Sequence, residues 1–235
     1  MFVLHPMIKW IQSFLDFIYP PVCLLCDTKL EENTPLCPGC LDAFLDSMTV
    51  TSQRDRKDFH HLTGDIFFDE VVTFWDYTSE TESLIHRVKY QRGKKLGVFL
   101  GSMAGRAFQE CSDDRKHDFL MPVPLHRTRL RERGYNQSGL VCRGMANHIP
   151  VAVHEGGLKR RRHTATQTHL SAHERQKNVG GAFIVDPRHP VHGKSVLVVD
   201  DVVTTGATMN SCAIALKQAG ARRVVGLALA RPQFK

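Results

Sequence analysis

The sequence predicts an α/β fold, in which a parallel sheet is flanked by helices, with a small cysteine-rich unit ahead of it. From residue 67 onward, strand-like apolar runs alternate with helix-like periodic segments. One of these runs ends in two adjacent carboxylates and a glycine-containing turn, and four cysteines near the N-terminus come in two close pairs. We therefore divide the 235 residues into an N-terminal helix and four-cysteine unit (1–45), a linker (46–65) and a main domain (66–235).

The first 19 residues are expected to form an amphipathic helix. Apolar residues recur at Ile8, Ile11, Leu15 and Ile18, and polar residues interrupt this stripe. The segment lacks the early positive charge and the small-residue cleavage site of a signal peptide. No apolar run approaches the roughly 18–20 residues of a membrane span, so we expect no stable membrane insertion. Packing against the rest of the protein is the first interpretation, and contact with a membrane surface is the alternative.

The paired cysteines predict a zinc site. Cys23 and Cys26 form one Cys-x2-Cys pair, and Cys37 and Cys40 form the second. Four thiolates complete the tetrahedral coordination of one Zn2+ and leave no position for water, so such a site is structural. In a unit this small the metal would supply most of the folding free energy, on the order of 10 kcal/mol. A redox dithiol or a pair of disulfides is the alternative.

Three further cysteines, Cys111, Cys142 and Cys212, lie singly in helix-like segments. We expect them to be small apolar residues of the core. Unpaired thiols in a chain without signal-peptide features favour a reducing, cytoplasmic location.

The main domain is expected to alternate strands with helices after a polar, irregular connection over residues 41–64. A strand rich in Phe, Val and Trp opens it, and the capping box Ser79-x-x-Glu82 introduces the first helix. This alternation favours a doubly wound parallel sheet, whose ligands bind outside the carboxyl ends of the strands. The expected strands are 67–77, 118–124, 149–153, 181–185, 195–199 and 223–230, and the expected helices lie near 79–88, 96–107, 137–148 and from 207 onward.

The most informative segment runs from Val196 to Thr208. Its apolar strand ends in Asp200 and Asp201, and the turn that follows is rich in hydroxyls and contains Gly206. Glycine lets a backbone approach a ligand closely, and the N-terminus of the following helix is a site for an anion. Carboxylates suited to ribose hydroxyls, or to a hydrated metal, thus adjoin a phosphate cradle. The segment predicts a binding site for a sugar phosphate.

Three other interpretations of this segment fit the sequence less well. A nucleotide-hydrolase strand also ends in an acid, but the Gly-Lys-Ser at 193–195 has Arg188 where the first glycine of a phosphate loop belongs, and it precedes a strand. A phospho-receiver domain carries its paired acids on its first strand, whereas these lie near the C-terminus. An ordinary strand–helix turn capped by Thr is the third, and it would leave two adjacent acids repelling each other without a cation.

Positive charge is concentrated in two loops. The formal net charge is +7, and residues 126–177 alone carry +8. The first loop, 124–137, follows a strand and enters a helix, and the second, 159–178, is long and short of apolar residues, as expected of a mobile lid. Both loops indicate a polyanionic ligand, and a merely solvated surface is the alternative.

The segment from Asp200 to Thr208 resembles the phosphoribosyl-pyrophosphate (PRPP) motif of type I phosphoribosyltransferases. With the paired cysteines and three further motifs, nearly the whole chain resembles the ComF/GntX family. Those motifs are Val88-Lys89-Tyr90, Arg131-Glu132-Arg133-Gly134-Tyr135-Asn136-Gln137 and Arg162-x3-Ala165-x-Gln167-x2-Leu170-x4-Arg175-x2-Asn178-Val179. The resemblance implies a type I phosphoribosyltransferase-like parallel sheet with an N-terminal zinc ribbon. It also implies a possible link to DNA uptake in natural competence, which some members have.

The resemblance further implies a transferase that binds PRPP with Mg2+ and passes the phosphoribosyl group to an unidentified acceptor. Asp200 and Asp201 would hold the ribose hydroxyls and stabilise the developing cation. Arginines would neutralise the departing pyrophosphate in a bidentate geometry that lysine cannot match. The catalytic candidates are Asp200, Asp201, Arg162 and Arg175, and the PRPP-binding candidates are Val202, Val203, Thr204, Thr205, Gly206, Ala207, Thr208, Lys89, Arg131 and Arg133.

A non-catalytic module that binds single-stranded nucleic acid through the basic loops and the zinc ribbon is the alternative function. A DNA-uptake protein is a further candidate partner. The basic loops hold one aromatic residue, Tyr135, which favours phosphate chemistry over base stacking. Tyr90, Tyr135 and Phe183 are candidates to stack on a base, although burial is the commoner state of an aromatic. The histidines in or beside the loops, at positions 126, 163, 169 and 173, are expected to be surface residues.

Overall fold

The computed structural model describes residues 21–31, 34–54, 59, 62, 64–89, 93–111, 116–160 and 182–232. It divides the chain into two compact units, Met1–Ser47 and Met48–Lys235. The helix expected over the first 19 residues lies outside the described residues, and so does most of the second basic loop. In the described part of the chain, no helix combines the length and the apolar character that a membrane crossing needs.

The N-terminal unit is a loop-rich segment that ends in helix α2 (Pro38–Asp46). Proline stands at the start of α2, where its missing N–H costs no hydrogen bond. An isolated antiparallel bridge joins Val22 to Lys29 and brings the flanks of the first cysteine pair together. Three of its apolar side chains, those of Leu30, Leu36 and Phe44, are buried.

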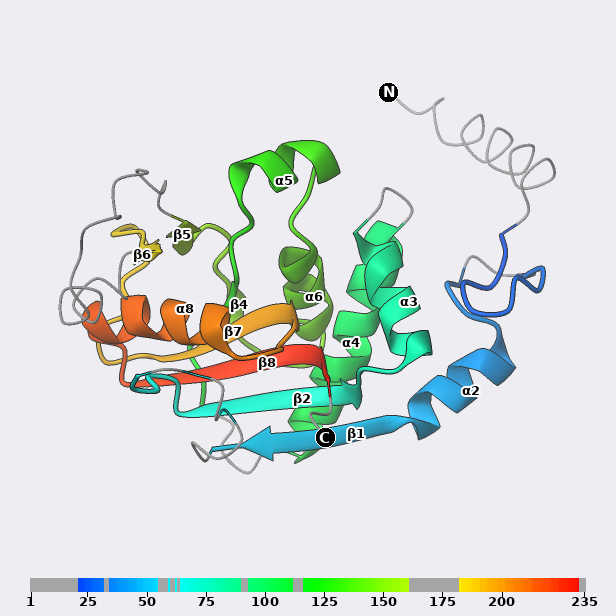
Figure 1. The fold of residues 1–235 in the computed structure, drawn as a ribbon, viewed down its shortest axis with the longest axis horizontal. Helices are drawn as coiled ribbons and strands as arrows, with labels where there is room; N and C mark the ends of the chain where they lie inside the picture. Colours follow the sequence, from blue (N-terminus) through cyan, green and yellow to red (C-terminus); the bar gives the residue numbers. More distant parts are fainter. Residues whose placement is uncertain are drawn as a thin grey trace, which may run out of the picture. The chain divides into compact units, whose positions relative to one another are not determined.

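The main unit is built on a six-stranded sheet in the order β1-β2-β8-β7-β3-β4 (Figure 1). The strand β1 pairs antiparallel with β2 at one edge, and every other pair in this sheet is parallel. The strands are β1 (Met48–Gln53), β2 (Glu70–Asp76), β3 (Phe119–Pro122), β4 (Ala152–Val153), β7 (Ser195–Val202) and β8 (Arg223–Arg231). A separate antiparallel pair joins β5 (Leu158–Arg160) to β6 (Phe183–Val185).

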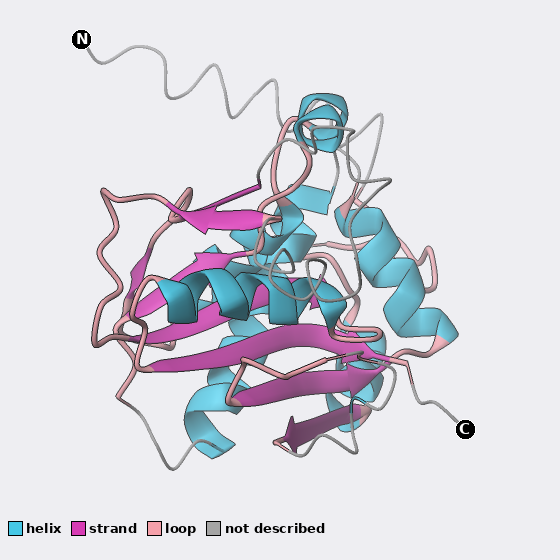
Figure 2. Cartoon of the chain, turned by 60° about the vertical axis from the view of Figure 1, so that its left-hand side comes forward, coloured by secondary structure: helices cyan, strands magenta, loops and turns pink. Residues whose placement is uncertain are grey.

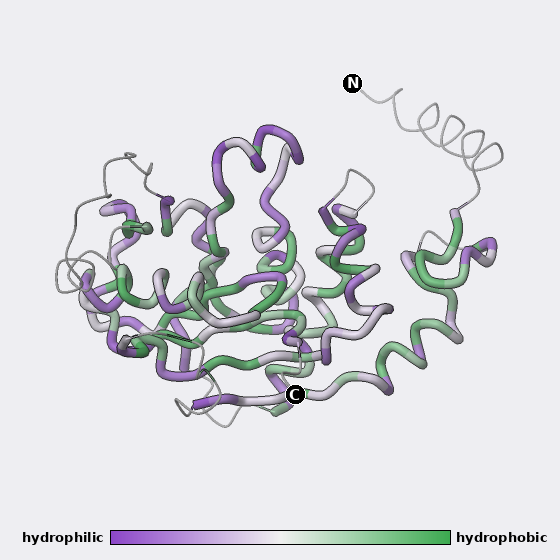
Figure 3. Tube along the Cα trace, in the orientation of Figure 1, coloured by the Kyte–Doolittle hydropathy of each residue, from purple (hydrophilic) through white to green (hydrophobic). Residues whose placement is uncertain are grey.

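Helices cover both faces of this sheet (Figures 1 and 2). On one face lie α3 (Ser79–Val88), α4 (Gly93–Cys111) and α6 (Gln137–Met145). The helices α4 and α6 approach so closely that a Cβ added at Gly101 or Gly144 would collide with the backbone of the other helix. On the other face, Met209, Cys212 and Leu216 of α8 (Ala207–Gln218) join the core formed by alternate residues of β7 and β8. The short helix α5 (Arg127–Arg133) has no buried residue, and its trace is largely hydrophilic (Figure 3).

The mixed α/β architecture and the parallel sheet confirm the expected fold class. Several local predictions were wrong. The side chain of Thr78, not of Ser79, caps α3 by accepting a hydrogen bond from the amide of Thr81 at 3.3 Å. Part of the expected irregular connection forms α2 and β1, and part of the expected basic loop 124–137 forms α5. The strand expected at 181–185 pairs with β5 outside the main sheet.

Candidate functional site

Two half-buried carboxylates mark the carboxyl end of β7. The strand is longer than expected and runs through both acids to Val202. The Asp200 carboxylate accepts a hydrogen bond from the amide of Asp201 at 2.9 Å, and the Asp201 carboxylate accepts one from the amide of Val202 at 2.9 Å. These local bonds fix both side chains at the strand end, where parallel sheets bind their ligands.

The first turn of α6 supplies a donor to each carboxylate. The Ser138 hydroxyl donates to Oδ1 of Asp200 at 3.1 Å, and the Gln137 amide donates to Oδ2 of Asp201 at 3.3 Å. Asn136 positions this turn in two ways. Its side-chain oxygen caps α6 by accepting from the amide of Ser138 at 3.2 Å, and its side-chain nitrogen donates to the carbonyl of Val123 beyond β3 at 2.9 Å. The carboxylates of β7 and the N-terminus of α6 therefore form one hydrogen-bonded unit.

Two cations approach this unit. Lys89, directly after α3, places its Nζ 3.7 Å from Oδ2 of Asp201. The guanidinium of Arg133 donates to the side-chain oxygen of Gln137 at 2.9 Å, so it reaches Asp201 through Gln137. The Tyr135 hydroxyl donates to the carbonyl of Val88 at 2.7 Å and ties the end of α5 to the end of α3. The site thus draws on three segments that are far apart in the sequence, residues 88–89, 133–138 and 200–202.

The charge balance at the carboxylates favours a bound cation. Burial, reinforced by the negative charge of Asp201, holds the pKa of Asp200 well above the usual range of a carboxyl group. A divalent cation with oxygen ligands would relieve this repulsion. The carboxylate oxygens of Asp200 and Asp201 are donors of the kind that Mg2+ prefers.

The turn from β7 to α8 forms the second half of the site. Thr204, Thr205 and Thr208 are exposed around it. Gly206 occupies the N-cap position of α8 with a φ of +82°, a left-handed conformation that favours glycine. A Cβ at this position would also lie 2.9 Å from the ring of Phe59. Gly206 has no side chain to cap α8, and the amide of Ala207 donates to the Thr205 hydroxyl at 3.3 Å. The N-terminus of a helix is a common site for an anion.

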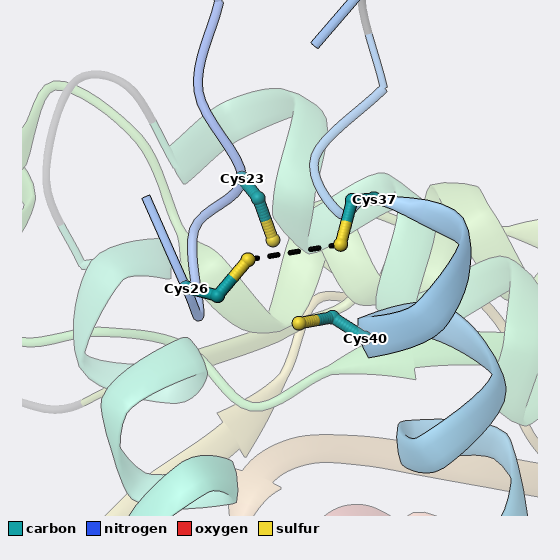
Figure 4. A group of neighbouring side chains, drawn as sticks. All are labelled: Cys23, Cys26, Cys37 and Cys40. Carbon is teal, nitrogen blue, oxygen red and sulfur yellow. Dashed lines mark hydrogen bonds between the residues drawn. The ribbon is translucent and has the colours of Figure 1, made fainter. Parts of the chain in front are cut away.

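The four cysteines of the N-terminal unit point toward one another (Figure 4). Their sulfur atoms all lie within 4.8 Å of one another, and those of Cys26 and Cys37 are 3.7 Å apart. Four ligands at the Zn–S distance of about 2.3 Å in tetrahedral geometry would have sulfurs about 3.8 Å apart. The cluster therefore has the size that Zn2+ requires.

Two thiols of the cluster also differ strongly in pKa. A hydrogen bond with the Thr28 hydroxyl lowers the pKa of Cys26 to about 6. Hydrogen bonds with the sulfurs of Cys26 and Cys37 raise the pKa of Cys40 to about 12. Ionisation of one thiol thus opposes ionisation of its neighbour, and a tetrahedral zinc ion would supply the positive charge that lets all four bind as thiolates.

Comparison with known proteins finds a matching domain family for each part of the chain. A phosphoribosyl transferase domain family matches residues 141–231, and a double zinc ribbon domain family matches residues 14–49. The DNA utilization protein YhgH of Salmonella typhimurium is 31% identical, over 86% of this chain and 87% of its own. Competence protein F of Haemophilus influenzae is 30% identical, over 95% of this chain and 87% of its own. This chain belongs to the ComF family. The competence protein ComFC of Bacillus subtilis is 28% identical, over 91% of this ComF-family chain and 85% of its own.

Solved structures resemble parts of this ComF-family protein at lower identity. The glutamine PRPP amidotransferase from B. subtilis, complexed with ADP and GMP, aligns with 61% of this chain and 30% of its own, at 22% identity and a TM-score of 0.43. A hypoxanthine phosphoribosyl transferase of Trypanosoma cruzi aligns with 64% of this chain and 66% of its own, at 16% identity and a TM-score of 0.36. Family membership therefore rests on the sequence relatives.

The structure brings together four of the residues that the sequence of this ComF protein predicted for the site. Asp200, Asp201, Lys89 and Arg133 lie in one network, and the turn 202–208 follows the two acids directly. Arg131 lies on the exposed surface of α5. The predicted catalytic residues Arg162 and Arg175, like Tyr90, lie outside the described residues.

Two residues of the network were not predicted from the sequence as site residues. Gln137 and Ser138 are buried and contact the two acids directly, although Gln137 stands in the quoted motif that ends at that residue. The sequence signal that could have identified them is a pair of polar residues at the start of the helix expected after the strand 118–124. Phe183, a candidate for base stacking, is 3% exposed and belongs to the core.

Proposed function

We propose that this ComF-family protein binds PRPP and transfers its phosphoribosyl group to a nitrogen acceptor, with release of pyrophosphate. The observation that supports this most directly is the pair Asp200 and Asp201 beside the left-handed Gly206 turn. Ser138 and Gln137 hold the two carboxylates, and the N-terminus of α8, whose N-cap residue Gly206 offers no capping side chain, follows within a few residues. Few ligands other than a sugar phosphate need two carboxylates and a phosphate cradle in direct succession.

The residues would act mainly through electrostatics. The bond between C1′ and the pyrophosphate oxygen breaks with positive charge developing on the ribose, and the acceptor nitrogen bonds from the opposite face. Asp200 and Asp201 would accept hydrogen bonds from the ribose hydroxyls and place negative charge near the developing cation. When bound, Mg2+ would supply charge neutralisation at the pyrophosphate oxygens, held through the same carboxylates and water.

The turn and the two cations would bind the charged ends of PRPP. The amides and hydroxyls of residues 204–208 would hold the 5′-phosphate at the helix N-terminus. Lys89 and Arg133 would face the pyrophosphate, and ligand binding would compete with the contacts that now hold them to Asp201 and Gln137. Arg131, Arg162 and Arg175 are proposed to add positive charge from the two loops.

Pyrophosphate release tests the transfer step. The native protein would be incubated with Mg2+, PRPP and either ammonia or one of the five common nucleobases, and compared with the Asp200→Asn/Asp201→Asn double variant. We expect pyrophosphate release above the double variant with at least one acceptor. If PRPP saturates the protein but no acceptor gives release above that variant, the transferase proposal fails and a PRPP-binding role without catalysis replaces it.

A second candidate function is binding of single-stranded nucleic acid, and the exposed helix α5 favours it. Arg127, Arg129 and Arg131 are exposed there. The slope of log K against log salt should be about −0.7 per phosphate contacted. Replacing these three arginines with glutamine should weaken binding of a deoxythymidine oligomer and flatten that slope by about 2. An unchanged slope would exclude α5 as the contact surface.

We place the protein in the cytoplasm because its cysteines outside the zinc cluster, Cys111, Cys142 and Cys212, are free thiols. The relatives named for DNA utilization and competence support a partner in DNA uptake, either the single strand itself or a protein of that process.

A further inference from the structure

A cleft of 450 Å3 is lined by residues of α5 and α6. On α6, Gln137 and Ser138 contact the carboxylates of β7. The residues that follow them on the same helix, Gly139, Leu140 and Arg143, line the cleft instead. We refer to this space as the α5 cleft. None of the described residues proposed above to bind PRPP is among those that line it.

Most of the wall of the α5 cleft is apolar and smooth. Pro122 and Pro124 at the end of β3, Leu130 of α5 and Leu158 of β5 all line it. Three glycines also line it, so parts of the wall carry no side chain and a ligand can approach the backbone closely. These glycines are Gly134, Gly139 and Gly156. A wall of this kind suits a flat ring.

One side of the α5 cleft offers an aromatic ring. Tyr135 lines the cleft and is half-buried, and the Nζ of Lys94 lies 5.3 Å from the centroid of its ring. The hydrogen bond from the Tyr135 hydroxyl to the carbonyl of Val88 fixes the ring in place. An aromatic side chain stacks on any nucleobase, because every base has a π-face.

The rim of the α5 cleft offers both donors and acceptors. Arg143 donates from Nε to Oε1 of Glu155 at 2.6 Å and from Nη2 to Oε2 at 3.1 Å. The side chains of Arg143 and Glu155 are 56% and 44% exposed, so this pair keeps polar atoms at the surface. The polar edge of a nucleobase likewise carries donors and acceptors side by side.

Positive charge lies next to the α5 cleft. The helix α5 contains four arginines and one glutamate. Arg127 precedes Leu130 by three residues and so shares its face of the helix, whereas Arg129 lies on another face. Within the described residues, neither arginine forms an ion pair. The adjoining stretches outside the described residues, 90–92 and 161–181, hold five basic residues and one acid, so their composition adds positive charge.

We propose that the α5 cleft is a nucleotide-binding site. The base stacks on Tyr135 against the proline and leucine wall, its polar edge meets the pair of Arg143 and Glu155, and its phosphate pairs with Arg127. This site goes beyond the proposed transfer reaction, because it uses neither Asp200 nor Asp201. A free nucleotide and one nucleotide of a single strand share the chemistry that this site recognises.

Calorimetric titration tests for the site in the zinc-loaded, full-length protein. The ligands are the common nucleoside 5′-monophosphates and a deoxythymidine decamer, titrated without Mg2+ into native protein and the Asp200→Asn/Asp201→Asn variant. At least one should saturate both proteins. Ribose 5-phosphate has no base and thymidine has no phosphate, so each should bind at least tenfold more weakly. Saturation that the double variant loses would overturn the proposal and assign the nucleotide to the PRPP site, and absence of saturation by any ligand would also overturn it.

Variants locate the bound nucleotide. A Cβ at Gly139 would lie 3.7 Å from Asn136 and 3.9 Å from Glu155, which are ordinary contacts, so Gly139→Val fills the cleft without a forced clash. We expect Gly139→Val and Arg127→Gln each to weaken binding about tenfold, the equivalent of about 1.4 kcal/mol. Arg129→Gln is the matched control and should bind a monophosphate like the native protein. Native-like binding by Gly139→Val, or equal affinities of Arg127→Gln and Arg129→Gln, would overturn the proposal.

The decamer distinguishes the two sources of the nucleotide. If the site serves a strand, the decamer should bind at least tenfold more tightly than deoxythymidine monophosphate, and Gly139→Val should weaken both. Equal affinities of the decamer and the monophosphate would assign the site to a free nucleotide. A decamer whose affinity is the same in native protein and Gly139→Val would exclude the cleft as the contact of the strand. Binding of PRPP is measured separately, so failure of the nucleotide site leaves the transferase proposal untouched.

Discussion

The cysteine cluster and the carboxylate site both bring acidic groups close together, but they differ in the segments that hold these groups. In each, acidic groups crowd together and one group titrates far above its usual pKa, Cys40 in the first and Asp200 in the second. The four sulfurs belong to one short segment and lie within 4.8 Å of one another, so together they could complete the coordination of one zinc ion. The carboxylates are held by hydrogen bonds from Gln137 and Ser138, which lie 64 and 62 positions away from them in the sequence. A closed set of ligands supports folding, whereas an open set supports binding.

Removing the metal should have the largest effect and should be confined to the first unit. Because a zinc site supplies on the order of 10 kcal/mol to a unit of this size, chelation or Cys40→Ser should unfold residues 21–47. Amide hydrogen exchange would then show lost protection in α2 and unchanged protection in β7 and β8. The Cys111→Ser variant is the matched control and should exchange like the native protein. Retained protection in α2 after complete zinc removal would contradict a structural role.

Changing the cation beside Asp201 should affect binding without affecting the fold. Lys89 is partly exposed and pairs with Asp201 at 3.7 Å, so Lys89→Met removes a charge-assisted contact worth about 1.5–3 kcal/mol if the ligand takes it over. We expect PRPP affinity to fall at least about tenfold in calorimetry. Arg106→Gln, which breaks an exposed ion pair on α4, should leave the affinity unchanged. Equal affinities for the two variants would place the pyrophosphate elsewhere.

The left-handed turn can be tested with a pair of glycines. Gly206 and Gly64 both have a positive φ, +82° and +92°, but only a Cβ at Gly206 would meet a neighbouring side chain. Alanine at either position should cost about 1–2 kcal/mol of backbone strain. Gly206→Ala should cost more, because the ring of Phe59 must move. The midpoints of urea unfolding measure this difference, and equal midpoints would show that the contact with Phe59 contributes nothing.

The raised pKa of Asp200 predicts the smallest effect, a pH dependence of PRPP binding. The ligand-free carboxyl keeps its proton up to an unusually high pH, whereas the complex with Mg2+ needs the carboxylate. Binding therefore releases a proton below that pKa, and affinity should rise with pH until the free carboxyl ionises. Calorimetry in buffers of different ionisation enthalpy measures the protons released. The same dependence in Asp200→Asn would assign it to another group.

The comparison also explains what the sequence could predict. The cysteine pairs and the strand that ends in two acids are local patterns, so their chemistry was predictable. Gln137 and Ser138 were not predicted as site residues, because their partners lie 64 and 62 positions away and only the packing of α6 beside β7 brings them together. Helix α5 was missed because it buries no residue and so has no apolar stripe. Strand β1 was missed because it is short and none of its six residues is buried, although Thr49, Val50 and Thr51 favour a strand.

The central claim is that Asp200 and Asp201 form a PRPP site. The most direct test is calorimetric titration of PRPP with Mg2+ into the zinc-loaded native protein, the Asp200→Asn/Asp201→Asn variant and the Glu110→Gln variant, which changes an exposed acid on α4. The account predicts micromolar binding, on the order of −8 kcal/mol, to the native and Glu110→Gln proteins and none to the double variant. Absence of heat with folded native protein, or equal binding by all three, would contradict it.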